Sequence, residues 1–318
     1  MRIVIIGGSG HVGTYLVPWL VKLGHEVIHV SRGNGKPYHP DPSWNQVKQV
    51  TIDRGSEEAA GRFGQRIKEL QPDIVIDMIC FTLDSAKQLV EALQGQVQHL
   101  LSCGTIWVHG PSIEVPVTEE QPRKPFGAYG VQKAEIETYL LDQARRGNVP
   151  ATVLHPGHIV GPGWAPLNPQ GHFNPEVFAK LAGSETITLP NFGMETVHHV
   201  HAEDVAQAFV KAIANWSAAV GESFHVVSPA ALTLRGYAEQ AASWFGVAAD
   251  LRFMPWDEWR TTVSEQEARS TWDHIAHSPN CSIEKAKRLL SYQPRYSSLG
   301  AVRESVMWLM EKGNLALS

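Results

Sequence analysis

The sequence predicts an α/β fold, in which a doubly wound parallel sheet carries helices on both faces and a smaller C-terminal domain is interleaved with it. Three observations predict this class. Short runs rich in β-branched residues alternate with helical segments over the first half of the 318-residue chain. A glycine-rich turn directly follows the first of these runs. Proline and glycine then become dense between Pro156 and Gly171, which is typical of loops at the rim of a site.

The individual elements follow from the same patterns in chain order. Residues 2–6 are apolar and β-branched, as expected of a strand buried on both faces of a parallel sheet. A helix from 11 to about 24 and a strand at 25–30 complete a first β-α-β unit. The alternation then repeats, with strands expected near 47–52, 73–79 and 99–103 and helices near 57–70, 83–93 and 128–146.

Two later segments are expected to return to the same sheet. Residues 151–154 and 224–227 read as strands, although the chain between them is dominated by loops. We therefore expect a sheet-containing domain of residues 1–163, to which residues 197–228 return, and a second domain of residues 164–196 and 229–318.

Composition limits the partners and the kind of site. The chain has 27 Lys and Arg against 32 Asp and Glu, a net charge of −5, so it has no general attraction to nucleic acid or to an anionic membrane. Its cysteines, Cys80, Cys103 and Cys281, have no CxxC spacing, which argues against a zinc site and a disulfide framework. The apolar N-terminal run is too short for a signal peptide, and no stretch is long enough to span a membrane. We expect a cytoplasmic protein.

Gly7, Gly10 and Gly13 form a GxxGxxG pattern between the first strand and the first helix. The first glycine permits a tight turn, the second lets the backbone approach a pyrophosphate, and the third permits close packing of the helix. The backbone amides at the start of the helix, at His11 and Val12, would then face the phosphates. The position of this pattern within a β-α-β unit predicts a bound dinucleotide.

The end of the second strand bears on the choice of dinucleotide. A carboxylate there would favour NAD, since it hydrogen-bonds the ribose 2′-hydroxyl and repels a 2′-phosphate. This chain has Ser31 and Arg32 instead, with Lys36 nearby. Because a guanidinium can pair with a 2′-phosphate, the sequence favours NADP; NAD is the alternative if Arg32 only stacks over the adenine or is solvated. Asp53 is a candidate contact to the adenine edge, or a surface carboxylate in a turn.

Tyr129 and Lys133 form the only YxxxK in the chain, a spacing that places both side chains on one face of a helix. A tyrosine with its ordinary pKa of about 10 is a poor base at neutral pH. An ammonium one turn away, together with the charge of an oxidised nicotinamide, would stabilise the phenolate. The pair is therefore a candidate for proton transfer beside the dinucleotide.

Together these features resemble the extended short-chain dehydrogenases/reductases, which include the NAD(P)-dependent sugar epimerases and dehydratases. Other family segments recur in the same order, at 108–110, 155–163, 198–209 and 282–294, so the resemblance covers nearly the whole chain. It implies a Rossmann-like sheet, and it implies that Thr105, with Ser102 as the fallback, polarises the substrate oxygen. His155 and Asn174 lie in segments like those that hold the substrate, so both are expected as substrate contacts.

The chain departs from the family where a substrate diphosphate is recognised. The usual arginine before the H-V-x-D segment is replaced by Val197, His198 and His199. Three arginines elsewhere in the second domain are candidates to supply the missing charge, although exposed arginines are common: Arg252, Arg260 and Arg269.

Other departures concern the chemistry. The dehydratases of the family carry acidic residues after the catalytic threonine, where this chain has Ile106 and Trp107, so elimination of water lacks its acid and base. Trp107 is instead a candidate to stack on a sugar. The histidines at 198, 199 and 201 lack partners with ligand spacing, so we expect no metal site.

The resemblance implies, as the first hypothesis, an epimerase of a sugar or nucleotide sugar that forms a transient keto intermediate and returns the hydride. Tyr129 would take the hydroxyl proton, Thr105 would hold the oxygen, and Lys133 would hold the cofactor ribose and tune Tyr129. An NADPH-dependent reductase of a keto sugar or other ketone is the alternative, favoured by Arg32. A third possibility is a non-catalytic nucleotide-sensing or RNA-associated protein of the same fold. A homodimer through the helices at 83–93 and 128–146 is expected by analogy.

Overall fold

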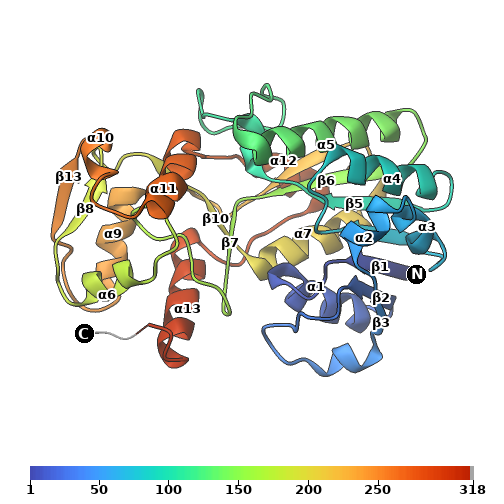
Figure 1. The fold of residues 1–318 in the computed structure, drawn as a ribbon, viewed down its shortest axis with the longest axis horizontal. Helices are drawn as coiled ribbons and strands as arrows, with labels where there is room; N and C mark the ends of the chain where they lie inside the picture. The colour runs from blue at the N-terminus through green and yellow to red at the C-terminus, as the bar shows by residue number, and fades with distance from the viewer. Residues whose placement is uncertain (316–318) are drawn as a thin grey trace.

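The computed structural model describes residues 1–315 and has a seven-stranded parallel sheet at its centre (Figure 1). The strands pair in the order β11-β6-β5-β4-β1-β2-β3, and every neighbouring pair is parallel. The predicted doubly wound α/β class is therefore confirmed, including the return of two late segments to the sheet. The strands are β1 (Arg2–Ile6), β2 (Glu26–Ser31), β3 (Lys48–Thr51), β4 (Ile74–Asp77), β5 (His99–Cys103), β6 (Ala151–Pro156) and β11 (Ser223–Val226).

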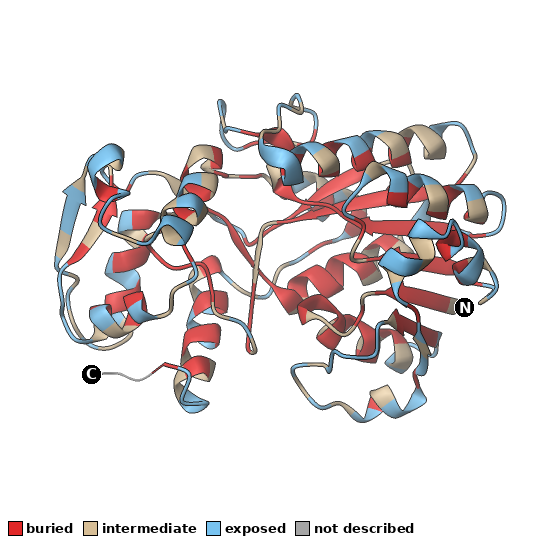
Figure 2. Ribbon diagram, in the orientation of Figure 1, coloured by how far each residue is buried: buried red, intermediate tan, exposed pale blue. Residues whose placement is uncertain are grey.

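Helices cover both faces of this sheet, and each face has its own apolar core. One core joins the strands to α1 (His11–Lys22), α7 (Ala202–Ala214) and α12 (Glu284–Leu290). The other joins them to α3 (Phe63–Lys68), α4 (Leu83–Leu93) and α5 (Gly127–Arg145). Figure 2 shows the sheet largely buried except at its edge strand β3, which explains why its central strands are continuous apolar runs rather than alternating ones.

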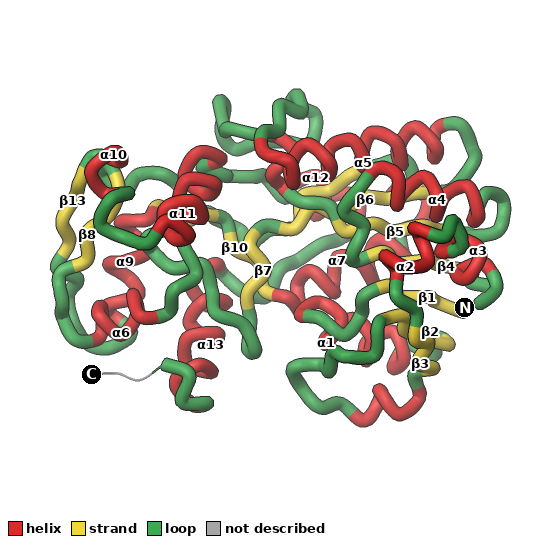
Figure 3. The backbone as a smooth tube through the Cα atoms, in the orientation of Figure 1, coloured by secondary structure: helices red, strands yellow, loops and turns green. Residues whose placement is uncertain are grey.

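The second group of elements packs around a third apolar core at the other end of the molecule, on the left of Figure 1. Figure 3 shows the short β7 and β10 crossing between this group and the main sheet. These two strands pair in parallel, outside the seven-stranded sheet. The elements of this part are β7 (His158–Val160), α6 (Glu176–Ala182), β8 (Ile187–Pro190), β9 (Thr196–Val197), β10 (His199–His201), β12 (Leu232–Thr233), α9 (Leu234–Ser243), β13 (Leu251–Met254), α10 (Trp256–Trp259), α11 (Glu265–His277) and α13 (Ser298–Glu311).

One predicted helix is divided in the structure. The segment expected as one helix at 57–70 forms α2 (Arg54–Ala59) and α3, with Gly61 between them at φ +65°. Only glycine adopts this left-handed conformation without strain, so α2 ends there and the chain turns before α3 begins. The predicted helix at 57–70 is therefore wrong in its continuity, although both pieces lie within or next to the expected range.

No helix within residues 1–315 is both long enough and apolar enough to cross a membrane.

Candidate active site

Two cavities meet at the carboxyl end of the central strands, on either side of the glycine turn. The first has a volume of about 830 Å³ and extends from the turn to α11, and the second has a volume of about 640 Å³ and extends along the ends of β2 and β3. Gly7, Gly10, Ile79 and Phe81 line both. Ligands of open α/β sheets bind at this edge, and two joined cavities offer space for the two halves of a dinucleotide and for a substrate.

The glycine turn has the shape that a pyrophosphate needs. Gly7 has φ +83°, and a Cβ at Gly13 would stand 1.9 Å from the carbonyl oxygen of Gly8. A Cβ at Gly10 would meet no atom closer than 4.0 Å, so it would point into the open space where the cavities join. His11 and Val12 begin α1 and line the first cavity. These residues therefore fit a dinucleotide: two glycines build the turn, and the third keeps its surface bare.

The second cavity is lined by the residues predicted to hold the adenosine half. Ser31, Arg32 and Asp53 all contribute to its wall, whereas Lys36 does not. The Oδ1 atom of Asp53 accepts a hydrogen bond from the Ser56 amide at 2.8 Å and caps α2. Arg32 is exposed and forms no side-chain hydrogen bond or ion pair within residues 1–315, so its guanidinium is free to meet a phosphate.

Arg54 differs from Arg32, although both line the second cavity. Its guanidinium contacts Glu58 at 2.6 Å and Asp77 at 2.7 Å, and the side chain is only 11% exposed. Because two carboxylates already balance its charge, Arg54 forms part of the cavity wall and is a weaker anion site than Arg32.

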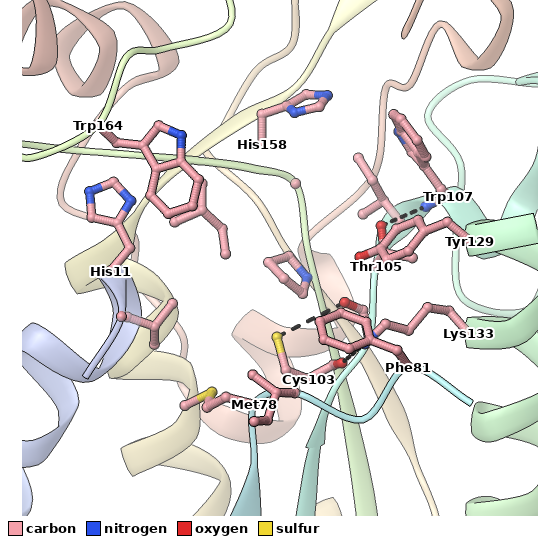
Figure 4. A pocket seen from close by; sticks show the side chains of 18 of the residues that line it. His11, Met78, Phe81, Cys103, Thr105, Trp107, Tyr129, Lys133, His158 and Trp164 are labelled. Carbon is pink, nitrogen blue, oxygen red and sulfur yellow. Dashed lines mark hydrogen bonds between the residues drawn. The ribbon is translucent and has the colours of Figure 1, made fainter. Parts of the chain in front are cut away.

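The predicted proton-transfer residues converge in the first cavity (Figure 4). Lys133 is buried on α5, and its Nζ donates to the carbonyl oxygens of Cys80 and Cys103 at 2.8 Å each. The same Nζ lies 5.8 Å from the centre of the Tyr129 ring. Thr105 follows β5, and its hydroxyl accepts the Trp107 amide at 3.3 Å, which holds the turn after the strand in place. Ser102 is buried in β5 and does not line the cavity.

The Tyr129 hydroxyl is protonated at neutral pH in this geometry. Burial raises the pKa of Tyr129 to about 12, and a hydrogen bond with Thr105 offsets part of this effect. The ring centre of Trp107 lies 5.9 Å from that of Tyr129, edge-on, and 4.3 Å from that of His277, on which it stacks, so Tyr129 packs against an aromatic cluster. Trp107 thus lines the cavity, as expected.

His155 and Asn174, the other two expected substrate contacts, do not line the cavity. His155 is fully buried in β6: its Nδ1 accepts the Thr105 amide at 3.0 Å, and its Nε2 lies 3.0 Å from Glu137. This contact supports the Thr105 turn from behind and leaves His155 no access to a substrate. Asn174 donates to Glu267 at 2.9 Å and joins two elements of the second part of the molecule.

The sequence analysis missed two histidines that line the cavity. His158 in β7 and His274 in α11 face it together, with ring centres 4.4 Å apart. Burial, with a smaller contribution from neighbouring histidines, lowers the pKa of His158 well below its usual value and that of His274 to about 4. Both imidazoles are therefore neutral hydrogen-bonding groups at pH 7. His158 could have been suspected from its position inside the 155–163 segment; nothing local marked His274.

The histidines at 198, 199 and 201 are buried, and no group of three or more potential ligands within residues 1–315 has the geometry to hold a metal ion. His198 instead shares a hydrogen bond with the Ser228 carbonyl and accepts the Cys281 amide. Their arrangement has a structural explanation within the fold.

Comparison with curated proteins finds relatives with several activities. The chain is 27% identical to 2'-dehydrokanamycin reductase of Streptomyces kanamyceticus over 320 residues, which cover 99% of this chain and 86% of the relative. It is 24% identical to the chloroplast stem-loop binding protein of 41 kDa b of Arabidopsis thaliana, covering 96% and 78%. It is 26% identical to UDP-glucose 4-epimerase of Corynebacterium glutamicum over about half of each chain, 51% and 52%.

Solved structures share the whole fold. A UDP-glucose 4-epimerase from Thermotoga maritima, solved with UDP-glucose, superposes with a TM-score of 0.74 at 19% identity and covers 98% of this chain and 99% of that one. A dTDP-glucose 4,6-dehydratase from Bacillus anthracis, solved with NAD, gives a TM-score of 0.75 at 17% identity and covers 99% and 98%. The expected extended short-chain dehydrogenase/reductase class is confirmed. With its residues 3–226 matching the family model, the chain belongs to the NAD dependent epimerase/dehydratase family.

Proposed function

We propose that this protein is an NADPH-dependent reductase of a keto group on a sugar or similar polyhydroxylated ring. The observation that carries the proposal is the lack of a cluster of cations in the substrate half of the first cavity, where Arg269 is the one arginine of the described lining. Besides its imidazoles, the described lining contains two basic side chains, Lys133 and Arg269. Lys133 is held by two carbonyl oxygens, and Arg269 contacts Glu265 at 2.8 Å with 73% of its side chain exposed.

This lack bears on epimerisation through the geometry of the intermediate. An epimerase must turn its keto intermediate over so that hydride returns to the opposite face, and the unreacting part of the substrate must stay bound during that rotation. A nucleotide diphosphate provides such an anchor where arginines bind it. The cavity presents neutral imidazoles and rings instead, including His158 and Trp164. A one-way reduction needs no rotation, so it suits this cavity better.

The residues around the reacting oxygen are in the protonation state that reduction requires. A bound nicotinamide cofactor in its reduced form supplies the hydride. Thr105 would donate a hydrogen bond to the substrate carbonyl oxygen, and the Tyr129 hydroxyl, protonated at neutral pH, would give its proton to that oxygen. Lys133 would hold the cofactor ribose and stabilise the phenolate that remains.

The preference for NADPH rests on Arg32 in the second cavity, and 2'-dehydrokanamycin reductase is a relative over nearly the whole chain. Epimerisation of a sugar or nucleotide sugar is the second candidate. The match to the family model and the relatives among UDP-glucose 4-epimerases support it.

The test starts with the nucleotide. Freshly purified protein is denatured, released nucleotides are identified by mass, and nucleotide-free protein is titrated with NADPH and NADH. Consumption of NADPH is then followed at 340 nm with a panel of keto sugars. An empty site that prefers NADPH, together with net NADPH consumption, is the expected result. Tightly held oxidised cofactor, with conversion of a sugar into its epimer and no net consumption, would instead establish the epimerase.

A further inference from the structure

Asp273 is a carboxylate of the cavity wall without a partner. It lies on α11, lines the first cavity and is partly buried, yet its side chain forms no hydrogen bond or ion pair within residues 1–315. Burial raises the pKa of Asp273, and the nearby charge of Arg269 only partly opposes this effect. Partial removal of a carboxylate from water without a partner costs free energy, and a cation bound in the cavity would recover it.

The surroundings of Asp273 suit a cation better than an anion. Exposed Trp164 and Phe173 and partly buried Trp107 line the same cavity, and aromatic faces attract positive charge. Figure 4 shows Trp164 with His11 on one side of the cavity and Trp107 with Thr105 and Tyr129 on the other. The imidazoles between them are neutral at pH 7, so they neither repel a cation nor attract a phosphate.

Arg269 is the charged side chain of the described residues that acts on Asp273 from nearby. It lies one helical turn before Asp273, where an i,i+4 ion pair would be possible. In the structure its guanidinium turns to Glu265 on the exposed side of α11. Asp273 therefore remains open towards the cavity.

We propose that the substrate carries a protonated amine, as in an amino sugar or aminocyclitol, and that this ammonium group pairs with Asp273 inside the aromatic cavity. The proposal rests on the proposed function for the position of the reacting carbonyl. It assigns the other end of the substrate, and it predicts that nucleotide diphosphate sugars are poor ligands.

The test is calorimetric titration of NADP⁺-loaded protein with a panel of amino sugars and aminocyclitols, each paired with its N-acetylated twin, which keeps the ring but loses the charge. Glucosamine with N-acetylglucosamine is the simplest pair, and UDP-glucose is the anionic probe. We expect at least one amine to bind about tenfold more tightly than its twin, because a desolvated ammonium gains both the carboxylate and the ring faces.

Three variants sharpen the result. D273N should remove the preference for the amine over its twin while leaving NADPH binding unchanged, and D257N, which removes an exposed carboxylate of α10, should keep it. R269A removes the internal competitor, so it should bind the amine as tightly as the wild type or more tightly. If Arg269 instead served an anionic substrate, R269A would weaken binding.

Equal affinity for every amine and its twin, no measurable binding of any amine, or tighter binding of UDP-glucose would overturn the proposal. The readout is binding, so its failure is distinguishable from failure of the proposed function. Amine binding without NADPH consumption would refute the reductase and keep the inference. NADPH consumption with neutral or anionic ketones only would keep the reductase and refute the amine-binding site.

Discussion

Among the single residues of the site, Tyr129 is the proposed proton donor. Its hydroxyl lines the cavity beside Thr105, and its pKa is raised to about 12. Y129F should leave NADPH affinity and melting temperature close to those of the wild type, because the ring and its packing against Trp107 remain. Turnover of a carbonyl substrate should fall by about 10²–10⁴-fold, the usual contribution of a positioned acid. Activity within about threefold of the wild type would remove Tyr129 from proton transfer.

Arg32 should decide between the two dinucleotides. R32A should raise the dissociation constant of NADPH by about tenfold, as expected for the loss of one charge-assisted contact to phosphate, and should leave that of NADH nearly unchanged. Fluorescence titration with both cofactors measures this. R303A, which removes an exposed arginine of α13, is the control and should change neither value. Equal weakening of both cofactors would mean that Arg32 contacts the adenine and not a 2′-phosphate.

At the scale of elements, the turn between β1 and α1 contains one glycine needed for folding, Gly13, and one needed for cofactor binding, Gly10. G13A would drive a methyl group into the Gly8 backbone, so we expect a loss of several kcal/mol in the free energy of unfolding. G10A adds the same methyl group where space is open, so stability should hold while cofactor affinity falls at least tenfold. Urea unfolding and NADPH titration of both variants give the comparison, and equal loss of stability in both would contradict it.

A chain of polar contacts joins α5 to the ends of β5 and β6. Arg123 contacts Glu137 at 2.6 Å, and Glu137 lies 3.0 Å from His155, which accepts the Thr105 amide. Arg123 and His155 hold the pKa of Glu137 far below its usual value, although burial alone would raise it. This chain of contacts supports from behind the turn that carries Thr105.

Breaking this link should therefore cost stability. E137Q should lower the free energy of unfolding by about 3 kcal/mol, because it leaves Arg123 without its carboxylate in a partly buried position. E135Q, an exposed position on the same helix, is the matched control and should change stability by less than about 0.5 kcal/mol. Urea unfolding at pH 7.5 measures both. If E137Q and E135Q changed the free energy of unfolding by similar amounts, the Arg123–Glu137 pair would contribute nothing measurable to stability.

At the scale of the whole molecule, buried neutral histidines should make the fold sensitive to acid. Seven of them have pKa values of about 3 to 4, well below 6.5, chiefly because burial disfavours the charged form: His11, His99, His109, His172, His198, His199 and His274. Below pH 6.5 these imidazoles become protonated in the unfolded chain but stay neutral in the folded chain. The free energy of unfolding is therefore unaffected by these histidines above pH 6.5, and it decreases as the pH falls from 6.5 towards 4.

Each such histidine opposes folding by about 1.4 kcal/mol per pH unit in this window, so several together should make the loss steep. We expect the melting temperature, followed by circular dichroism, to fall by many degrees between pH 7 and pH 5 and to change little between pH 7 and pH 8. A melting temperature constant to within about 2 °C from pH 7 to pH 5 would show that these side chains are accessible to protons in the folded state.

Some expectations about the whole molecule stay predictions. The domain bounds, the cytoplasmic location and the homodimer through α4 and α5 belong to this group. Within one chain α4 and α5 already pack on the same face of the sheet, and their outward positions are mostly polar. Sedimentation of the purified protein would measure its oligomeric state directly.

The sequence alone determined the sheet, the glycine turn and the Tyr129–Lys133 pair, because each depends on contacts within a few residues or on a repeating apolar pattern. The break at Gly61 was missed because a single glycine inside a helical pattern does not by itself mark the end of a helix. Only the tertiary structure decided that His155 supports Thr105 from behind, and that His274 and Asp273 reach the cavity from α11. Those positions depend on how segments 50 or more residues apart pack together, and no local pattern records that packing.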